Sequence, residues 1–193
     1  MSMSLFFFNP PKENIRAGGF DGKIEYLLEG EYKPVIAFQY LFGSGDRDSF
    51  SPTDTSTFGG NMPGTDNNNF VTFGHAQTGY ALYPQLINLH IFRFSGSFLP
   101  FVHSETFGKL RLGGAFITLD KDKRGGAISI RKIQNSERKE VGWEFDVFVQ
   151  WEVFSDLSVT FKWGHYQPGN VFPSSDGLRR QLDYFYLGTT LSF

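Results

Sequence analysis

Hydrophobic and polar residues alternate with a period of two along most of the chain. The clearest run covers residues 141–154, where Val141, Trp143 and further odd-numbered residues are apolar, while Glu144 and Asp146 stand between them. A period of two places successive side chains on opposite faces of a β-strand. Similar runs cover residues 20–29, 32–42, 88–98, 107–119, 157–164 and 182–193, and a weaker run covers residues 1–8. We therefore expect about eight strands.

The run over residues 88–98 changes parity in its middle. Leu89 and Ile91 share one face, whereas Phe92, Phe94 and Phe98 take the other. An extra residue in one strand of an antiparallel pair shifts the following side chains to the opposite face. A β-bulge near Ile91 is therefore expected, because it would restore a single apolar face.

The connections between the predicted strands alternate in length. Those near residues 30, 100 and 155 are short, whereas residues 9–19, 43–86, 120–139 and 167–181 are long and rich in Gly, Pro, Ser and Asn. In a meander, this puts all short turns at one end and all long loops at the other, which is typical of outer-membrane barrels. Within the longest connection, residues 70–83 are expected to be ordered or to fold into the lumen.

The composition supports a membrane barrel. The chain has 193 residues with 23 Phe, 8 Tyr and 22 Gly, yet no stretch of about 18 apolar residues that would form a transmembrane helix. Lipid-facing and lumen-facing residues alternate in a barrel, so their hydropathies cancel, and the mean here is −0.27. We expect an all-β fold, an antiparallel transmembrane β-barrel with meander topology, in the bacterial outer membrane. A soluble β-sandwich is the alternative, since its strands also alternate.

Cysteine and charge narrow the function. The absence of cysteine excludes disulfides, zinc–cysteine sites and thiol nucleophiles. A net charge of −2 gives no reason to expect nucleic acid as a partner. No cofactor is expected. His75, His90, His103 and His165 stand in no motif with a serine nucleophile, so we expect no enzyme. Asp46, Asp48 and Asp54 could bind calcium, although a solvated acidic loop is the simpler interpretation.

Charged residues gather on one face of the predicted strands. A lysine or arginine on the lipid face costs about 2–4 kcal/mol at mid-membrane. Charged positions opposite the apolar face are therefore the lumen-lining candidates, namely Lys23, Glu25, Lys109, Arg111, Glu144, Asp146, Glu152 and Lys162.

Tryptophans on the apolar face suggest how the strands cross the membrane. Trp143 and Trp151 are eight residues apart, roughly 20 Å along the membrane normal at about 3.3 Å per residue and a tilt near 40°. Trp163 is expected at the level of Trp143. The three are candidates for the aromatic girdles at the edges of the apolar band.

The last strand ends the chain with an aromatic residue. Gly188, Leu191 and Phe193 resemble the C-terminal pattern that the barrel-assembly machinery reads during insertion. In the meander, Phe193 falls on the side of the short turns, which is the periplasmic side in outer-membrane barrels. We therefore expect this machinery as a partner.

Residues 17–193, and the last fifty most strongly, resemble the C-terminal region of the alginate-export family of outer-membrane porins. The similarity rests on Gly142, Glu144 and Asp146, on the later motif Gly164, His165, Tyr166, Pro168, Gly169 and Phe172, and on Ser44-Gly45-Asp46. Family members are usually much longer. The resemblance therefore implies a single barrel domain over residues 1–193 or the C-terminal part of a larger barrel.

The family's exporters imply a lumen lined by basic groups. Because a path for a polyanion requires a positive lining, the mixed charge of the candidates here favours ion-pair networks or passage of small mixed solutes. We expect a porin-like channel or exporter component that passes small solutes or saccharides. The alternative is a non-transport barrel whose long loops bind surface partners, as adhesins do. Outer-membrane lipid is expected around the barrel, with lipopolysaccharide as a further partner of basic loop residues such as Arg179 and Arg180.

Overall fold

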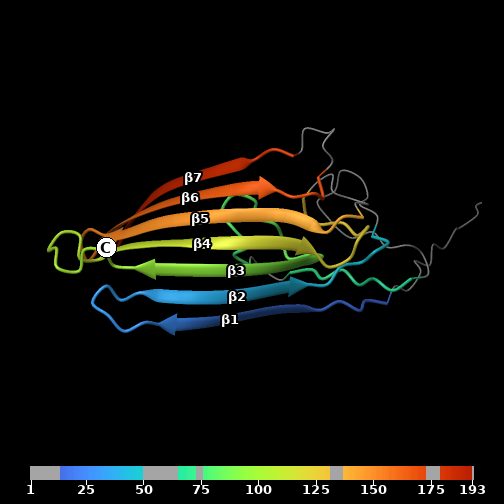
Figure 1. Ribbon diagram of the computed structural model, residues 1–193, viewed down its shortest axis with the longest axis horizontal. Coiled ribbons are helices and arrows are strands. Elements are labelled where there is room, and N and C mark those ends of the chain that lie inside the picture. The colour runs from blue at the N-terminus through green and yellow to red at the C-terminus, as the bar shows by residue number, and fades with distance from the viewer. Residues whose placement is uncertain (1–13, 50–64, 73–75, 131–136, 173–178, 193) are drawn as a thin grey trace, which may run out of the picture.

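The computed structural model describes residues 14–49, 65–72, 76–130, 137–172 and 179–192. Within these ranges the chain forms one antiparallel sheet whose seven strands follow one another in chain order (Figure 1). The strands are β1 (Gly19–Leu27), β2 (Val35–Gly43), β3 (Leu89–Phe98), β4 (Leu110–Lys121), β5 (Glu140–Glu152), β6 (Leu157–Pro168) and β7 (Leu182–Leu191). Period-two alternation thus located all seven, and the all-β meander is confirmed. The weaker strand predicted over residues 1–8 lies outside the described residues.

The sheet is open, with β1 at one edge and β7 at the other. Strand pairing therefore supports the antiparallel meander but leaves barrel closure untested. Within the described ranges, no helix is long and apolar enough to cross a membrane.

Long loops and short turns lie at opposite ends of the sheet (Figure 1). Residues 28–34, 99–109 and 153–156 connect strands at one end, and the strands flanking the longer connections 44–88, 122–139 and 169–181 end and begin at the other. β7 ends beside the start of β6, where Leu191 pairs with Leu157, so it finishes at the short-turn end. The arrangement agrees with the alternation of connection lengths in the sequence.

The two faces of the sheet differ in composition. The outer face carries exposed aromatic and aliphatic side chains, such as Phe94, which is 58% exposed, and Leu187, which is 73% exposed. The inner face, which carries Lys23 and Lys162, is polar near the short turns. Near the long loops it is apolar, because Leu89 and Ile91 are buried there in the hydrophobic core. Core residues of this cluster that come from the loops include Leu86, Ile128 and Phe172.

The expected bulge near Ile91 is wrong. β3 pairs with β2 and β4 in unbroken register through Ile91. The change in parity has another cause: Leu89 and Ile91 face the inner core under the loops, whereas Phe92 and Phe94 face outward. Both faces are apolar at this level of the sheet, and alternation alone cannot distinguish that from a bulge.

The irregularity lies in β5 instead. Leu119 pairs with Gly142 but Asp120 pairs with Glu140, so Val141 is an extra residue, a β-bulge. Val141 is consequently buried instead of lying on the outer face with Trp143, as the alternation had suggested.

Candidate functional site

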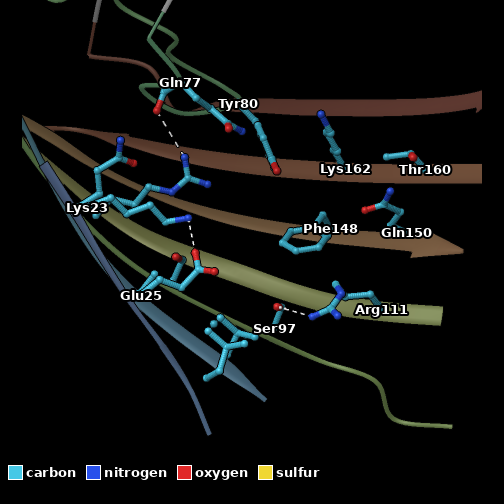
Figure 2. Close-up of a pocket in the computed structure, with 17 residues that line it drawn as sticks. Lys23, Glu25, Gln77, Tyr80, Ser97, Arg111, Phe148, Gln150, Thr160 and Lys162 are labelled. Carbon is cyan, nitrogen blue, oxygen red and sulfur yellow. Dashed lines mark hydrogen bonds and ion pairs between the residues drawn. The ribbon is translucent and has the colours of Figure 1, made fainter. Parts of the chain in front are cut away.

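A groove of about 700 Å³ runs along the polar part of the inner face (Figure 2). Its wall includes residues from β1 to β6, because inner-face positions of neighbouring strands stand side by side in the register. Lys23, Gln39 and Arg93, for example, are consecutive partners across β1, β2 and β3. The charged residues that line the groove are Lys23, Glu25, Arg93, Arg111 and Lys162.

The basic side chains of the groove have few acidic partners. Lys23 forms an ion pair with Glu25. Arg111 Nη1 donates to Ser97 Oγ at 3.1 Å, and Arg93 Nη1 donates to the backbone carbonyl of Gln77 at 3.4 Å. Within the described part of the chain, neither arginine forms an ion pair. Four cations and one carboxylate line the groove, which is a surplus of three positive charges.

Three predicted lumen carboxylates do not line this groove. Glu144 is fully buried and accepts the backbone N–H groups of residues 80–82. Asp146 is 1% exposed, and neither of its carboxylate oxygens has a hydrogen-bond partner among the described residues. Glu152 pairs with Lys109 at 3.2 Å outside the groove lining. These carboxylates therefore contribute no exposed negative charge to the groove.

The predicted lumen-lining residues thus divide into groups. Lys23, Glu25, Arg111 and Lys162 line the groove together, Glu144 and Asp146 lie buried, and Lys109 precedes β4 next to Glu152. Sequence reasoning missed Arg93 as a candidate. Its place between Phe92 and Phe94 was the available signal, because alternation puts it opposite the apolar side chains.

A second cavity of about 540 Å³ adjoins the groove. It is lined by Gln77, Gly79, Tyr80, Tyr83, Lys162 and Tyr184, of which Gln77, Tyr80 and Lys162 also line the groove. Lys162 Nζ lies 5.2 Å from the centre of the Tyr80 ring and 5.6 Å from that of Tyr186, within cation–π range. The sequence predicts that residues 70–83 are ordered or fold into the lumen. In the structure, residues 76–83 pack on the inner face of the sheet.

The family motif surrounds the bulge in β5. Gly142 has φ +145°, and a Cβ there would stand 2.3 Å from the backbone oxygen of Gln167. Tyr166 donates its hydroxyl to the carbonyl of Val141 at 2.5 Å, and the N–H of Gly169 reaches the same carbonyl at 2.8 Å. These motif residues thus fix the long-loop ends of β5 and β6.

The three tryptophans lie on the outer face, but not all at the expected levels. Trp143 pairs with Gln167 and Trp151 with Val159, whereas Trp163 pairs with Val147, midway along β5. The expected level of Trp163 is wrong because β6 continues to Pro168 instead of ending near Gly164. Trp143 and Trp151 remain candidates for girdle residues, and Trp163 stands between their levels.

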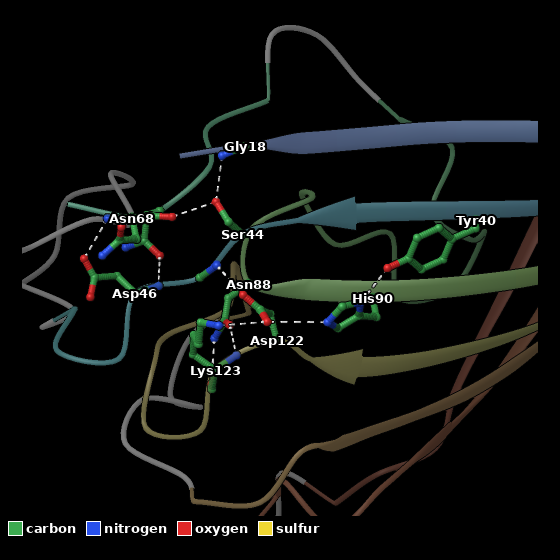
Figure 3. A network of polar contacts seen from close by, with 11 residues as sticks. Gly18, Tyr40, Ser44, Asp46, Asn68, Asn88, His90, Asp122 and Lys123 are labelled. Atoms are coloured by element: carbon green, nitrogen blue, oxygen red, sulfur yellow. Dashed lines mark hydrogen bonds and ion pairs between the residues drawn. The ribbon is translucent and has the colours of Figure 1, made fainter. Parts of the chain in front are cut away.

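The acidic loop near Asp46 is held by hydrogen bonds (Figure 3). The two carboxylate oxygens of Asp46 accept the N–H groups of Asp48 at 3.3 Å and Asn68 at 2.9 Å. Burial and the neighbouring Asp48 carboxyl raise the pKa of Asp46, while the hydrogen bond with Asp46 lowers the pKa of Asp48. Asp54 lies outside the described residues. Among the described residues there is no group of three metal-ligating side chains.

Three histidines make polar contacts near the strand ends or in a turn. His90 Nδ1 bonds to the Tyr40 hydroxyl at 2.8 Å, and its Nε2 lies 3.5 Å from Asp122 (Figure 3). His165 pairs with Asp183 at 2.9 Å, and His103 pairs with Glu31. His75 is outside the described residues. Among the proposed insertion residues, Gly188 and Leu191 lie in β7, and Phe193 is outside the described residues.

A meander with an aromatic outer face, a polar inner face and loops gathered at one end fits the transport barrels of the bacterial outer membrane. The chain belongs to the alginate export family, whose model matches residues 11–182. This is a family of outer-membrane transport porins. No curated protein matches the chain.

Proposed function

We propose that this chain forms wall strands of an outer-membrane pore that passes an anionic saccharide, a polyuronate of the alginate type. In this proposal residues 1–193 belong to one barrel domain, and its inner face borders the transport path. The surplus of three positive charges along the groove is the observation that carries the proposal.

The charge distribution of the groove favours this substrate over the small mixed solutes that the sequence led us to expect. That expectation counted Glu144, Asp146 and Glu152 as lumen charges, but none of them lines the groove. What remains is Lys23, Arg93, Arg111 and Lys162 against Glu25. A polyuronate carries a carboxylate on every sugar, so a basic path lowers the energy of each passing unit.

The uncharged polar side chains of the groove suit a saccharide polymer that must bind in the pore and then leave it. Gln39, Gln150 and Thr160 line it and can exchange hydrogen bonds with sugar hydroxyls. Arginine binds carboxylate with two parallel hydrogen bonds, whereas lysine acts as a mobile point charge. Several moderate sites in series allow a polymer to move, because no single site holds it tightly.

The outer face supports the placement in the membrane. Its exposed aromatic and aliphatic side chains would contact lipid, with Trp143 and Trp151 near the edges of the apolar band. In this arrangement the long loops face outward toward lipopolysaccharide. Gly188, Leu191 and Phe193 would be read by the barrel-assembly machinery from the periplasmic side.

The test is ion current through the protein in planar bilayers, with alginate oligomers added as blockers. Arg111→Gln and Lys162→Gln each remove one groove charge, and each should weaken the block about tenfold, as expected for one charge-assisted hydrogen bond. Lys109→Gln is the matched control, because it removes the same charge outside the groove.

Equal effects of all three substitutions would contradict the proposed path, since the groove charges would then affect the block no more than the charge of Lys109 outside the groove. A wild-type protein that carries current but is not blocked by alginate oligomers would contradict the proposed substrate.

A further inference from the structure

Residues 76–86, here called the inner loop, leave the long-loop end of the sheet and fold over its inner face. We propose that the inner loop is a fixed constriction of the pore and that Glu144 is the residue that positions it. The positioning stands on the contacts below, whereas the role as a constriction rests on the proposed transport function.

Glu144 holds the inner loop through its backbone. Its Oε1 accepts the N–H groups of Tyr80 and, at 2.7 Å, Ala81, and its Oε2 accepts that of Leu82 at 3.0 Å. A fully buried carboxylate is costly unless donors surround it, and three convergent N–H groups supply them. Three consecutive backbone donors aimed at one side chain leave the loop little freedom to move.

Two glycines make this close approach possible. A Cβ on Gly79 would stand 2.6 Å from Glu144 Oε1, and its φ of +155° is one that other residues rarely adopt. A Cβ on Gly164 in β6 would stand 2.9 Å from the Cβ of Tyr80. The wall of the sheet is therefore flat where the loop rests, and the loop has no side chain where the carboxylate meets it.

The tip of the inner loop stands beside the charged groove. Lys162 Nζ lies over the Tyr80 ring, and Tyr80 borders both the groove, where Figure 2 shows it, and the second cavity. Arg93 adds a second tie by donating to the Gln77 carbonyl. Tyr80 thus lines both cavities, of about 700 and 540 Å³, and brings an aromatic ring next to a groove cation.

The position of the inner loop can be measured by thiol labelling, which does not require the protein to conduct. Because the chain has no cysteine, an introduced cysteine is labelled at one site. Ala81→Cys would be introduced as the only thiol, and its labelling by a water-soluble maleimide followed in the folded protein. Adding Glu144→Ala removes all three acceptor contacts, and Glu144→Gln keeps the Oε1 acceptor but turns an NH₂ donor toward Leu82 N–H. Glu152→Gln is the control, because it removes a carboxylate from the same strand and face without touching the loop.

We expect labelling to accelerate about tenfold or more with Glu144→Ala, and less with Glu144→Gln, since each lost charge-assisted hydrogen bond favours opening. Glu152→Gln should leave the rate unchanged. Gly79→Val approaches the same contact from the loop and should also accelerate labelling. Only variants that keep a heat-modifiable gel shift are compared. Unchanged labelling in folded Glu144 and Gly79 variants would overturn the positioning role.

Bilayer recordings on the same variants test the constriction. Single-channel conductance should rise and selectivity between anions and cations should fall with Glu144→Gln, but not with Glu152→Gln. If labelling becomes faster but the conductance of a conducting protein does not change, the proposed role of the inner loop as a constriction is wrong. The positioning role of Glu144 would still stand. A wild-type protein without current would contradict the proposed function and the constriction, whereas the labelling result would still decide the role of Glu144.

Discussion

Gly142 shows how a single residue shapes the functional end of the sheet. Its φ of +145° accommodates the bulge that buries Val141, and a Cβ there would meet both Gln167 and the Tyr166 ring. The Val141 carbonyl at the bulge accepts from Tyr166 and Gly169, which joins β5 to β6 and to the loop that follows β6. Glu144 and Asp146 lie just beyond the bulge, in the part of β5 that pairs with β4 in unbroken register from Gly142 to Trp151.

Gly142→Ala should therefore destabilise the fold by about 1–3 kcal/mol, the usual cost of a residue held in an unfavourable backbone region. Gly96→Ala in β3, two strands away, is the matched control, because its nearest neighbour, the Val35 carbonyl, would lie 3.5 Å from the new Cβ. Urea titration of both variants in detergent measures the difference. Equal midpoints would show that the bulge can form without glycine.

At the scale of elements, alternation is a reliable guide as long as the two faces differ. It located all seven described strands and placed Lys23, Arg111 and Lys162 together on one face. It failed at Ile91, where both faces are apolar. It also could not show that Glu144 is withdrawn from the groove, because its partner Ala81 is 63 residues away in the sequence. That contact depends on how a long loop folds, which no local pattern encodes.

The register of β5 and β6 makes a prediction about depth. Trp163 pairs with Val147, midway between the levels of Trp143 and Trp151. In variants that keep one tryptophan each, lipids with a quencher deep in the acyl chain should quench Trp163 most strongly. Lipids with a quencher near the headgroup should act more on Trp143 and Trp151, as girdle residues require. Equal depth profiles would contradict membrane-spanning strands in this register.

At the scale of the whole molecule, the two faces of the sheet have different surfaces and therefore different proposed roles. Exposed apolar side chains cover the outer face, and the inner face combines a dry core under the loops with a basic groove nearer the short turns. From the sequence alone, the lumen-lining candidates include as many basic as acidic residues, and the net charge of the chain is −2. Burial of Glu144 and Asp146 changes that balance, so the groove is basic although the protein is acidic.

The most direct test of this account is the reversal potential of the wild-type protein in a planar bilayer under a tenfold potassium chloride gradient. The surplus of three positive charges along the groove predicts a clear preference for chloride, with the potential displaced toward the chloride equilibrium value. High salt on both sides should reduce the preference, since it screens the groove charges. A pore that prefers potassium would contradict the claim that this inner face is a path for anions.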